Sequence, residues 1–264
     1  MLHCALSLVL PSSRPRVCAV SFLNTVPLVW GMLHGDERDV FDLSFSVPSE
    51  CADRVAAGNA DLGILPVAEI QRLNLPYFRD VGIACRGPVR SILLISKTKP
   101  QDIRTLAADS SSRTSVMLAR VVLDQRYACR PAIRTMAPDL PGMLAEADAA
   151  LIIGDPALRI EPNSLPYSVL DLGREWTRMT GLPMVFALWS GPEQFLTDAN
   201  RRVFSDSCRF GMRHLDDIVA STSASMGFSE DLVRGYLTNN LALELGTDDL
   251  RGLDLFLSYA AAMR

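Results

Sequence analysis

Short apolar segments alternate with helix-type segments from residue 16 onward, and this alternation constrains the fold more than any other feature of the chain. The first three apolar segments have the length of buried strands, and each is soon followed by a proline. Predicted strands cover residues 16–22, 41–47 and 62–65, and predicted helices cover residues 49–57 and a segment from residue 67. Ser49 is the expected N-cap of the first helix and Gly58 its stop. This order of elements predicts an α/β fold with a parallel, doubly wound sheet.

The same pattern begins again near residue 99, and a chain of 264 residues is long enough for two lobes. Further buried strands are predicted at residues 91–96, 106–109, 149–153 and 184–189, and later helices at residues 195–215, 218–226, 229–238 and 247–262. We interpret the polar stretch after residue 96 as one crossover between the lobes and the strand at 184–189 as the return. Lobe 1 is therefore predicted to hold residues 16–98 and 190–264, lobe 2 residues 99–189, and an N-terminal extension residues 1–15. We expect the last helix to pack onto lobe 1.

Charge and the types of side chain present exclude several classes of function. The net charge is −4, and no run of Lys or Arg is present to follow a phosphate backbone, so we expect no nucleic-acid partner. Six cysteines are scattered without a C-x-x-C pair, and three histidines lie in no metal or triad spacing. We therefore predict buried, reduced cysteines, no bound metal, and chemistry that depends on other groups.

The apolar N-terminal segment does not have the features of a signal peptide. Residues 1–10 lack a preceding Lys or Arg, no A-x-A-like site follows, and the stretch is far shorter than the roughly 20 residues that cross a bilayer. We expect a disordered or mis-annotated extension, a cytoplasmic protein and no membrane partner. The sequence alone does not indicate an oligomeric state.

Polar residues follow the carboxyl ends of the predicted strands, where open parallel sheets bind their ligands. Ser21, Asn24 and Thr25 follow the first strand, and Asp155 follows the strand at 149–153. The Asn24 amide can orient a hydroxyl or a carboxylate, but asparagine is at least as common as a turn or cap residue. Asp155 is either an acid in the cleft or the N-cap of a helix with Pro156 at its first position, and its residue type favours the cap.

Residues 111–115 supply serine and threonine hydroxyls at the predicted start of a long helix. Unpaired backbone N–H groups and the helix dipole at such a position favour a carboxylate or phosphate. The alternative is that one serine caps the helix while the others are solvated. At the start of the crossover strand, Ser91 and the preceding Arg90 are also placed to face a cleft between the lobes.

Five motifs in order resemble the chorismate dehydratase family of the futalosine route to menaquinone. They are Ser21-Phe22-Leu23-Asn24-Thr25-Val26-Pro27-Leu28, the segment 58–67, the segment 87–94, the segment 111–116 and Thr180-Gly181-Leu182-Pro183-Met184-Val185-Phe186-Ala187. The resemblance covers about residues 16–261, and the residues before Arg16 have no counterpart in it. Each motif alone is weak, but five in register over this length are specific.

The resemblance implies a two-lobed, type 2 periplasmic-binding-protein-like fold whose inter-lobe cleft serves as an active site. It implies a cytoplasmic carbon–oxygen lyase that converts chorismate to 3-[(1-carboxyvinyl)oxy]benzoate with loss of water, without a metal or an organic cofactor. A sister family that makes dihydroxynaphthoate shares the fold. Its first motif resembles Ser-Pro-Cys-Pro-Asn-Asp, which differs from the segment that begins at Ser21 here.

We predict Asn24 and Ser91 as the catalytic residues and the substrate's own enolpyruvyl carboxylate as the acceptor of the ring proton. The elimination produces an aromatic ring, so positioning is expected to account for much of the catalysis. The predicted substrate-binding residues are Ser21, Thr25, Arg90, Ser112, Arg113, Thr114, Ser115 and Asp155. Glu69 and Asp155 remain alternative bases.

A solute-binding module without catalysis is the main alternative from another class, because the same fold most often binds ligands unchanged. This alternative predicts an export signal, a lipidated cysteine or a fused DNA-binding domain. Cys4 lies too near Met1 and lacks the basic start of a lipoprotein signal. The sequence therefore favours the enzyme.

Overall fold

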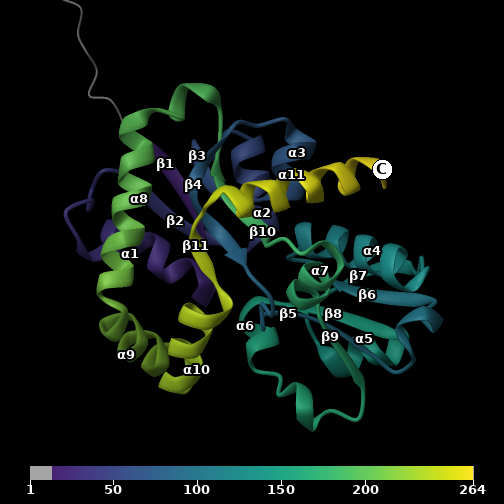
Figure 1. Cartoon of the computed structure of the whole chain (residues 1–264). Helices are drawn as coiled ribbons and strands as arrows, with labels where there is room; N and C mark the ends of the chain where they lie inside the picture. Colours follow the sequence, from purple (N-terminus) through teal and green to yellow (C-terminus); the bar gives the residue numbers. More distant parts are fainter. Residues whose placement is uncertain (1–13, 264) are drawn as a thin grey trace, which may run out of the picture.

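The computed structural model describes residues 14–263, which form two α/β lobes, each on its own sheet (Figure 1). The sheet of lobe 1 has the strand order β11-β4-β10-β3-β1-β2, and that of lobe 2 has the order β7-β6-β8-β5-β9. The strands are β1 (Arg16–Val20), β2 (Asp42–Ser46), β3 (Leu62–Pro66), β4 (Tyr77–Cys85), β5 (Ile92–Ser96), β6 (Thr105–Asp109), β7 (Ala132–Met136), β8 (Ala149–Ile153), β9 (Ser168–Asp171), β10 (Met184–Ser190) and β11 (Ala242–Glu244). The two-lobed α/β fold is thus confirmed, while most of the predicted extension lies outside the described residues.

Helices cover the sheets and make up most of the chain after residue 197. They are α1 (Val26–His34), α2 (Pro48–Ala56), α3 (Val67–Leu73), α4 (Thr114–Tyr127), α5 (Leu140–Glu146), α6 (Gly154–Leu158), α7 (Leu172–Thr180), α8 (Asp198–Arg213), α9 (Leu215–Met226), α10 (Glu230–Gly235) and α11 (Thr247–Ala262). A π-helical segment, Tyr236–Asn240, continues α10. The predicted bounds of the last helix are confirmed, whereas the predicted helix 229–238 divides into an α-helical and a π-helical part.

The prediction of parallel strands holds for part of each sheet. β1 lies parallel to β2 and β3, and β6 lies parallel to β7 and β8. The strands that follow the crossovers run the other way, since β10 is antiparallel to β3 and β4, and β5 is antiparallel to β8 and β9. Both sheets are therefore mixed, and in each one the strand that follows a crossing runs against its neighbours.

The two crossings lie earlier in the chain than the predicted boundaries at residues 98 and 189. β5 belongs to the sheet of lobe 2, so the first crossing covers residues 86–91. β10 belongs to the sheet of lobe 1, so the second crossing covers residues 181–183. Both strands are buried along their whole length, and such an apolar run looks the same whichever sheet it enters.

The start of α2 differs from the prediction because a proline occupies its first turn. Pro48 is the first helical residue and Val47 the N-cap, so Ser49 is not the cap. The Ser49 amide instead donates to the carbonyl of Ser111 in lobe 2, at 3.1 Å. Pro at this position needs no hydrogen bond and has a φ that suits the helix. Ser49 is therefore a contact between the lobes.

Helix α11 packs across both lobes rather than on lobe 1 alone (Figure 1). It contacts β10 and α3 of lobe 1 and α4 of lobe 2. Gly252 lies so close to the second crossing that a Cβ there would clash with the Pro183 carbonyl oxygen. Gly246 is the N-cap of α11, and the Gly246 amide donates to the Asp249 carboxylate at 2.8 Å. The helix therefore holds the return crossing against both lobes.

Candidate functional site

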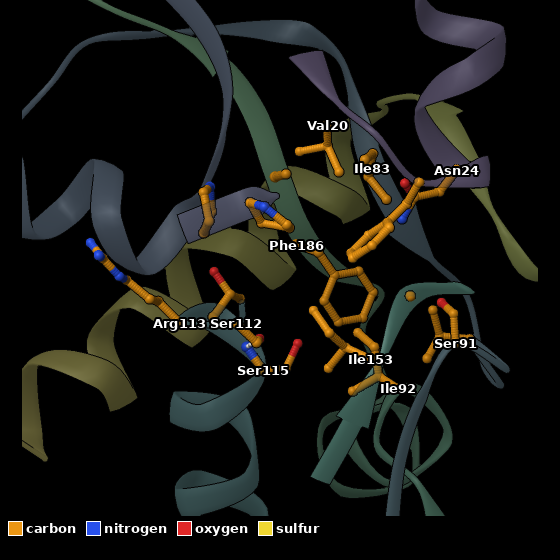
Figure 2. A pocket seen from close by; sticks show the side chains of 17 residues that line it. Val20, Asn24, Ile83, Ser91, Ile92, Ser112, Arg113, Ser115, Ile153 and Phe186 are labelled. Atoms are coloured by element: carbon orange, nitrogen blue, oxygen red, sulfur yellow. Dashed lines mark hydrogen bonds between the residues drawn. The ribbon is translucent and has the colours of Figure 1, made fainter. Parts of the chain in front are cut away.

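A pocket lies between the two lobes and takes its lining from both (Figure 2). Its cavity measures about 60 Å³, which is far below the roughly 300 to 1,000 Å³ typical of small-molecule sites. The lining residues are Val20, Phe22, Asn24, Pro48, Pro66, Ile83, Phe186 and Ala187 from lobe 1, and Val89, Ser91, Ile92, Ser112, Arg113, Thr114, Ser115, Ile153 and Gly154 from the first crossing and lobe 2. The lobes are thus close together, and a ring-sized ligand requires them to separate.

The middle of the pocket is apolar. The ring of Phe186, from β10, lies near the centre of the view in Figure 2, with Ile153 and Ile92 beside it. Phe22 packs directly on Gly154, where a Cβ would meet the ring at 2.5 Å. Gly154 also has a φ of +62°, so this contact between the lobes requires glycine for two reasons.

Asn24 and Ser91 lie at one end of the pocket and form its neutral polar end (Figure 2). Thr25 is buried, and its hydroxyl donates to Asn24 Oδ1 at 3.2 Å. Ser91 is 2% exposed and accepts a hydrogen bond from the buried hydroxyl of Tyr236, at 2.8 Å. The Ser91 carbonyl accepts from the Gly154 amide at 2.8 Å, which fixes its backbone. The structure therefore brings together the two residues predicted as catalytic.

Ser112 and Ser115 lie at the opposite end, where helix α4 begins (Figure 2). The Ser115 amide donates to the Ser112 hydroxyl oxygen at 3.2 Å, so Ser112 satisfies one of the first amides of the helix. Thr114 uses its hydroxyl oxygen to accept from the Ala68 amide of lobe 1, at 3.2 Å. Ser115 is buried and lines the pocket with its hydroxyl unbonded among the described residues. This end offers hydroxyl and amide donors to an anion.

Arg113 is the one charged residue among those that line the pocket in the described part of the chain. Its guanidinium forms ion pairs with Glu69 at 2.5 Å and Asp53 at 2.9 Å, both in lobe 1. Burial alone would raise the pKa of Glu69, but Arg72 and Arg113 together hold it below its usual value. The charge of Arg113 is therefore matched by carboxylates, and the group joins the lobes at this end.

Three of the predicted substrate-binding residues point away from the pocket or lie beside it. The guanidinium of Arg90 donates to the carbonyls of residues 157, 158 and 160. The Ser21 hydroxyl is exposed and donates to the Ser46 carbonyl at 3.3 Å. Thr25 does not line the pocket, but its hydroxyl donates to Asn24, which does. These side chains support the walls of the site and are not in its lining.

Asp155 is neither the N-cap that its residue type favoured nor a lining residue. The N-cap of α6 is Ile153, and Asp155 lies in the first turn. Its carboxylate accepts from the Leu23 amide of lobe 1 at 3.0 Å, so the residue joins the lobes behind Asn24. Burial raises its pKa, while the Leu23 amide and Arg159 act in the opposite direction.

The sequence did not indicate the apolar lining. Phe186 and Ala187 come from the middle of an antiparallel strand, and Ile83 comes from β4, for which no strand was predicted. A search of strand ends alone overlooks such residues. The signal available was the motif at 180–187, which contains both Phe186 and Ala187.

Two kinds of feature are absent from residues 14–263. No cluster of three His, Cys, Asp or Glu side chains in this range is arranged to hold a metal ion. Nor does this range contain a helix whose length and hydropathy would let it cross a membrane. Its five cysteines are buried, as predicted, and none of them is in a disulfide in the structure. Cys4 and the predicted extension before residue 14 lie outside the described range.

A family model described as menaquinone biosynthesis matches residues 15–262. The chain belongs to this family. A curated chorismate dehydratase from Thermus thermophilus is 26% identical over 92% of this chain and 94% of its own length. The match to the family confirms the recognition based on the five motifs.

Solved structures of other proteins share the fold. A protein from Archaeoglobus fulgidus has a TM-score of 0.78 at 16% identity, with 96% of this chain and 99% of that chain covered. The periplasmic aliphatic sulphonate binding protein from Escherichia coli has a TM-score of 0.61 at 15% identity, with 95% and 88% covered. These likenesses show that the fold is that of the periplasmic binding proteins.

Proposed function

We propose that this protein is a chorismate dehydratase, a hydro-lyase that converts chorismate to 3-[(1-carboxyvinyl)oxy]benzoate and water. In this reaction the C–H bond on the ether-bearing ring carbon breaks, and its electron pair forms the double bond that completes the aromatic ring. The C–O bond to the neighbouring hydroxyl breaks, and the hydroxide leaves with a proton as water. The net reaction is redox-neutral.

The observation that carries the proposal is the similarity to the Thermus thermophilus chorismate dehydratase along nearly the whole of both chains, in a family of menaquinone biosynthesis. The pocket adds chemical support, because its two ends differ in the way that this substrate requires. One end offers donors at a helix start for a carboxylate. The other holds Asn24 and Ser91, whose neutral polar groups suit a leaving hydroxyl and a developing negative charge.

We assign the helix start to one carboxylate of the substrate. Ser115 has a buried hydroxyl that faces the pocket, and the first amides of α4 lie beside it. Hydrogen bonds to a charged acceptor contribute about 1.5 to 3 kcal/mol each, so a few of them hold an anion without a free cation nearby. Arg113 then acts mainly by joining the lobes, since Glu69 and Asp53 already pair with it.

We assign the proton transfer to the substrate's enolpyruvyl carboxylate. The two alternative bases, Glu69 and Asp155, are not among the residues that line the pocket. Glu69 pairs with two arginines, and Asp155 accepts from the Leu23 amide. Asn24 then orients the departing hydroxyl, and Ser91 donates to an oxygen on which negative charge develops.

The test is to incubate the purified protein with chorismate and follow the products over time by ultraviolet absorption and mass spectrometry. Heat-killed protein and Asn24→Ala serve as controls for the spontaneous breakdown of chorismate. We expect a product lighter than chorismate by the mass of one water, with the spectrum of a substituted benzoate. Its formation must depend on active wild-type protein.

Two other outcomes would contradict the proposal in different ways. Tight binding of chorismate without a new product would favour a solute-binding module of the same fold. Neither binding nor turnover would favour the sister reaction that makes dihydroxynaphthoate, and its cyclic precursor would be assayed next. A cytoplasmic location remains a prediction from the sequence, to be tested by fractionating cells that express the full chain.

A further inference from the structure

Tyr236 is a buried tyrosine that reaches the back of the pocket from the C-terminal part of the chain. Its side chain is 2% exposed, and its hydroxyl donates to Ser91 Oγ at 2.8 Å. Tyr236 does not line the pocket, whereas Ser91 does. Any effect of this tyrosine on a ligand must therefore pass through a residue that lines the pocket, and Ser91 accepts its hydroxyl proton.

The direction of this hydrogen bond determines what Ser91 can do. A serine hydroxyl has one proton to donate and two lone pairs to accept with. Because the Tyr236 hydroxyl occupies one lone pair, the Ser91 proton must point elsewhere. Among residues 14–263 this proton has no acceptor, and Ser91 lies beside the pocket at the same end as Asn24 (Figure 2). Ser91 is therefore set to donate to an oxygen of a bound ligand.

Tyr236 can donate to Ser91 only while its phenol is protonated. Burial raises the pKa of its phenol above the usual value, while the hydrogen bonds with Ser91 and with the Asn24 side chain act more weakly in the opposite sense. A phenol in this environment stays neutral in the pH range of an ordinary assay. The proton that it donates to Ser91 is therefore not lost by ionisation in that range.

The position of the ring is fixed where the two lobes meet. Tyr236 packs in an apolar cluster that includes Leu23 from lobe 1 and Leu158 from lobe 2. It is also the first residue of the π-helical segment that continues α10. Such segments are rare in helices and occur frequently at functional sites. The C-terminal helices thereby supply a group to a site whose lining comes from the earlier parts of the two lobes.

We propose that Tyr236 is a positioning residue, which directs the Ser91 hydroxyl toward the oxygen of the bound anion where negative charge develops. This inference rests on the proposed dehydratase function and adds a residue to its site. Tyr236 touches no reacting atom. We expect Tyr236 to affect kcat more than KM. A Ser91 hydroxyl that must first reorient stabilises the negative charge of the transition state less well than one already in place.

The test is a double-mutant cycle with Tyr236→Phe and Ser91→Ala, measured as turnover of chorismate. In the wild-type background we expect Tyr236→Phe to lower kcat about tenfold with KM changed less than about twofold. In the Ser91→Ala background the same change is expected to lower kcat by less than about twofold, since nothing remains to be directed. A general loss of structure would lower kcat in both backgrounds.

Tyr127→Phe is the matched control, because it removes a hydroxyl that donates to Glu175 away from the pocket. An unchanged kcat in Tyr236→Phe, or an equal loss in both backgrounds, would overturn the role of Tyr236 and leave the dehydratase function standing. If wild-type protein binds chorismate without converting it, the proposed function fails. The effect of Tyr236→Phe is then measured on the dissociation constant of chorismate, in the wild-type and Ser91→Ala backgrounds. Absence of both turnover and binding in the wild type would overturn both proposals.

Discussion

The two ends of the pocket are built in different ways, although both lie where the lobes meet. At the neutral polar end, Asn24 and Ser91 are held by uncharged hydrogen bonds from Thr25 and Tyr236. At the helix start, Arg113 is tied to lobe 1 by two ion pairs. Neutral bonds in a buried place fix direction, whereas ion pairs across partly exposed surfaces break readily when the lobes open. We therefore expect the neutral polar end to take part in the chemistry, and the helix start to anchor the substrate and hold the lobes closed.

The largest effect is expected from Asn24→Ala, which removes the amide at the neutral polar end. Loss of one oriented donor in an active site typically costs about 100-fold or more in kcat. We expect a loss of this size with a change in KM below about threefold, measured by steady-state turnover of chorismate. Asn59→Ala, in the exposed loop after α2, is the control for removal of an amide. Full turnover in Asn24→Ala would remove the basis for assigning chemistry to this end.

Ser115→Ala tests the opposite end and should affect binding rather than turnover. The hydroxyl that it removes is buried, lines the pocket and has no partner among the described residues. A lost hydrogen bond to a carboxylate predicts a rise in KM of about tenfold with kcat nearly unchanged. Ser225→Ala, on the exposed face of α9, is the control. A fall in kcat with unchanged KM would mean that both ends take part in the chemistry.

The sequence predicted the residues of each end better than their partners. Asn24, Ser91 and the segment 112–115 all line the pocket, because strand ends and a helix start mark such places locally. Arg90 and Asp155 do not line it. Their partners lie 67 to 70 and 132 residues away in the chain, at distances where no local pattern operates.

The assignment of strands to sheets shows the same limit. Periodicity identified β5 and β10 as buried strands but not the lobe that each one joins, since both are apolar along their whole length. Tyr236 was overlooked for a related reason, because its partner Ser91 is 145 residues distant. Long-range pairing was therefore the part that required the structure.

Glu69→Gln tests whether the second end serves closure and stability. The carboxylate is nearly buried and pairs with Arg72 and Arg113, which are 52% and 32% exposed. Because the arginines are partly solvated, we expect a loss of about 1 to 2 kcal/mol in the free energy of unfolding at pH 7. Urea denaturation measures this loss, with the exposed Glu146→Gln as control, since Glu146 forms no ion pair among the described residues.

The pH dependence of this difference follows from the lowered pKa of Glu69. A carboxyl whose pKa is lower in the folded state stabilises that state above its unfolded value of about 4.3. The contribution is lost as the pH falls through the folded value. The wild type and Glu69→Gln should therefore differ at pH 7 and converge in acid. A difference that stays constant with pH would mean that Glu69 acts by packing alone.

Asp155→Asn is expected to have the smallest effect, and it tests whether the neutral polar end contains a hidden base. Burial raises the pKa of Asp155 in the folded state, so its ionised form disfavours folding, and stability falls as the pH rises through the folded pKa. Asparagine keeps an acceptor for the Leu23 amide without the charge. We expect a gain in stability of a few tenths of a kcal/mol at pH 7 and none below the unfolded pKa of about 3.9.

The activity of Asp155→Asn then decides between two mechanisms. If the substrate's carboxylate takes the proton, kcat should change by less than about threefold, because Asp155 does not line the pocket. If Asp155 is the base, its replacement should lower kcat by about 100-fold or more and remove the acid limb of the pH–rate profile, since general-base catalysis contributes about that much. A catalytic Asp155 would place a charge among the neutral groups behind Asn24. Charged side chains would then take part at both ends of the pocket, and the contrast between a neutral end and a charged end would no longer hold.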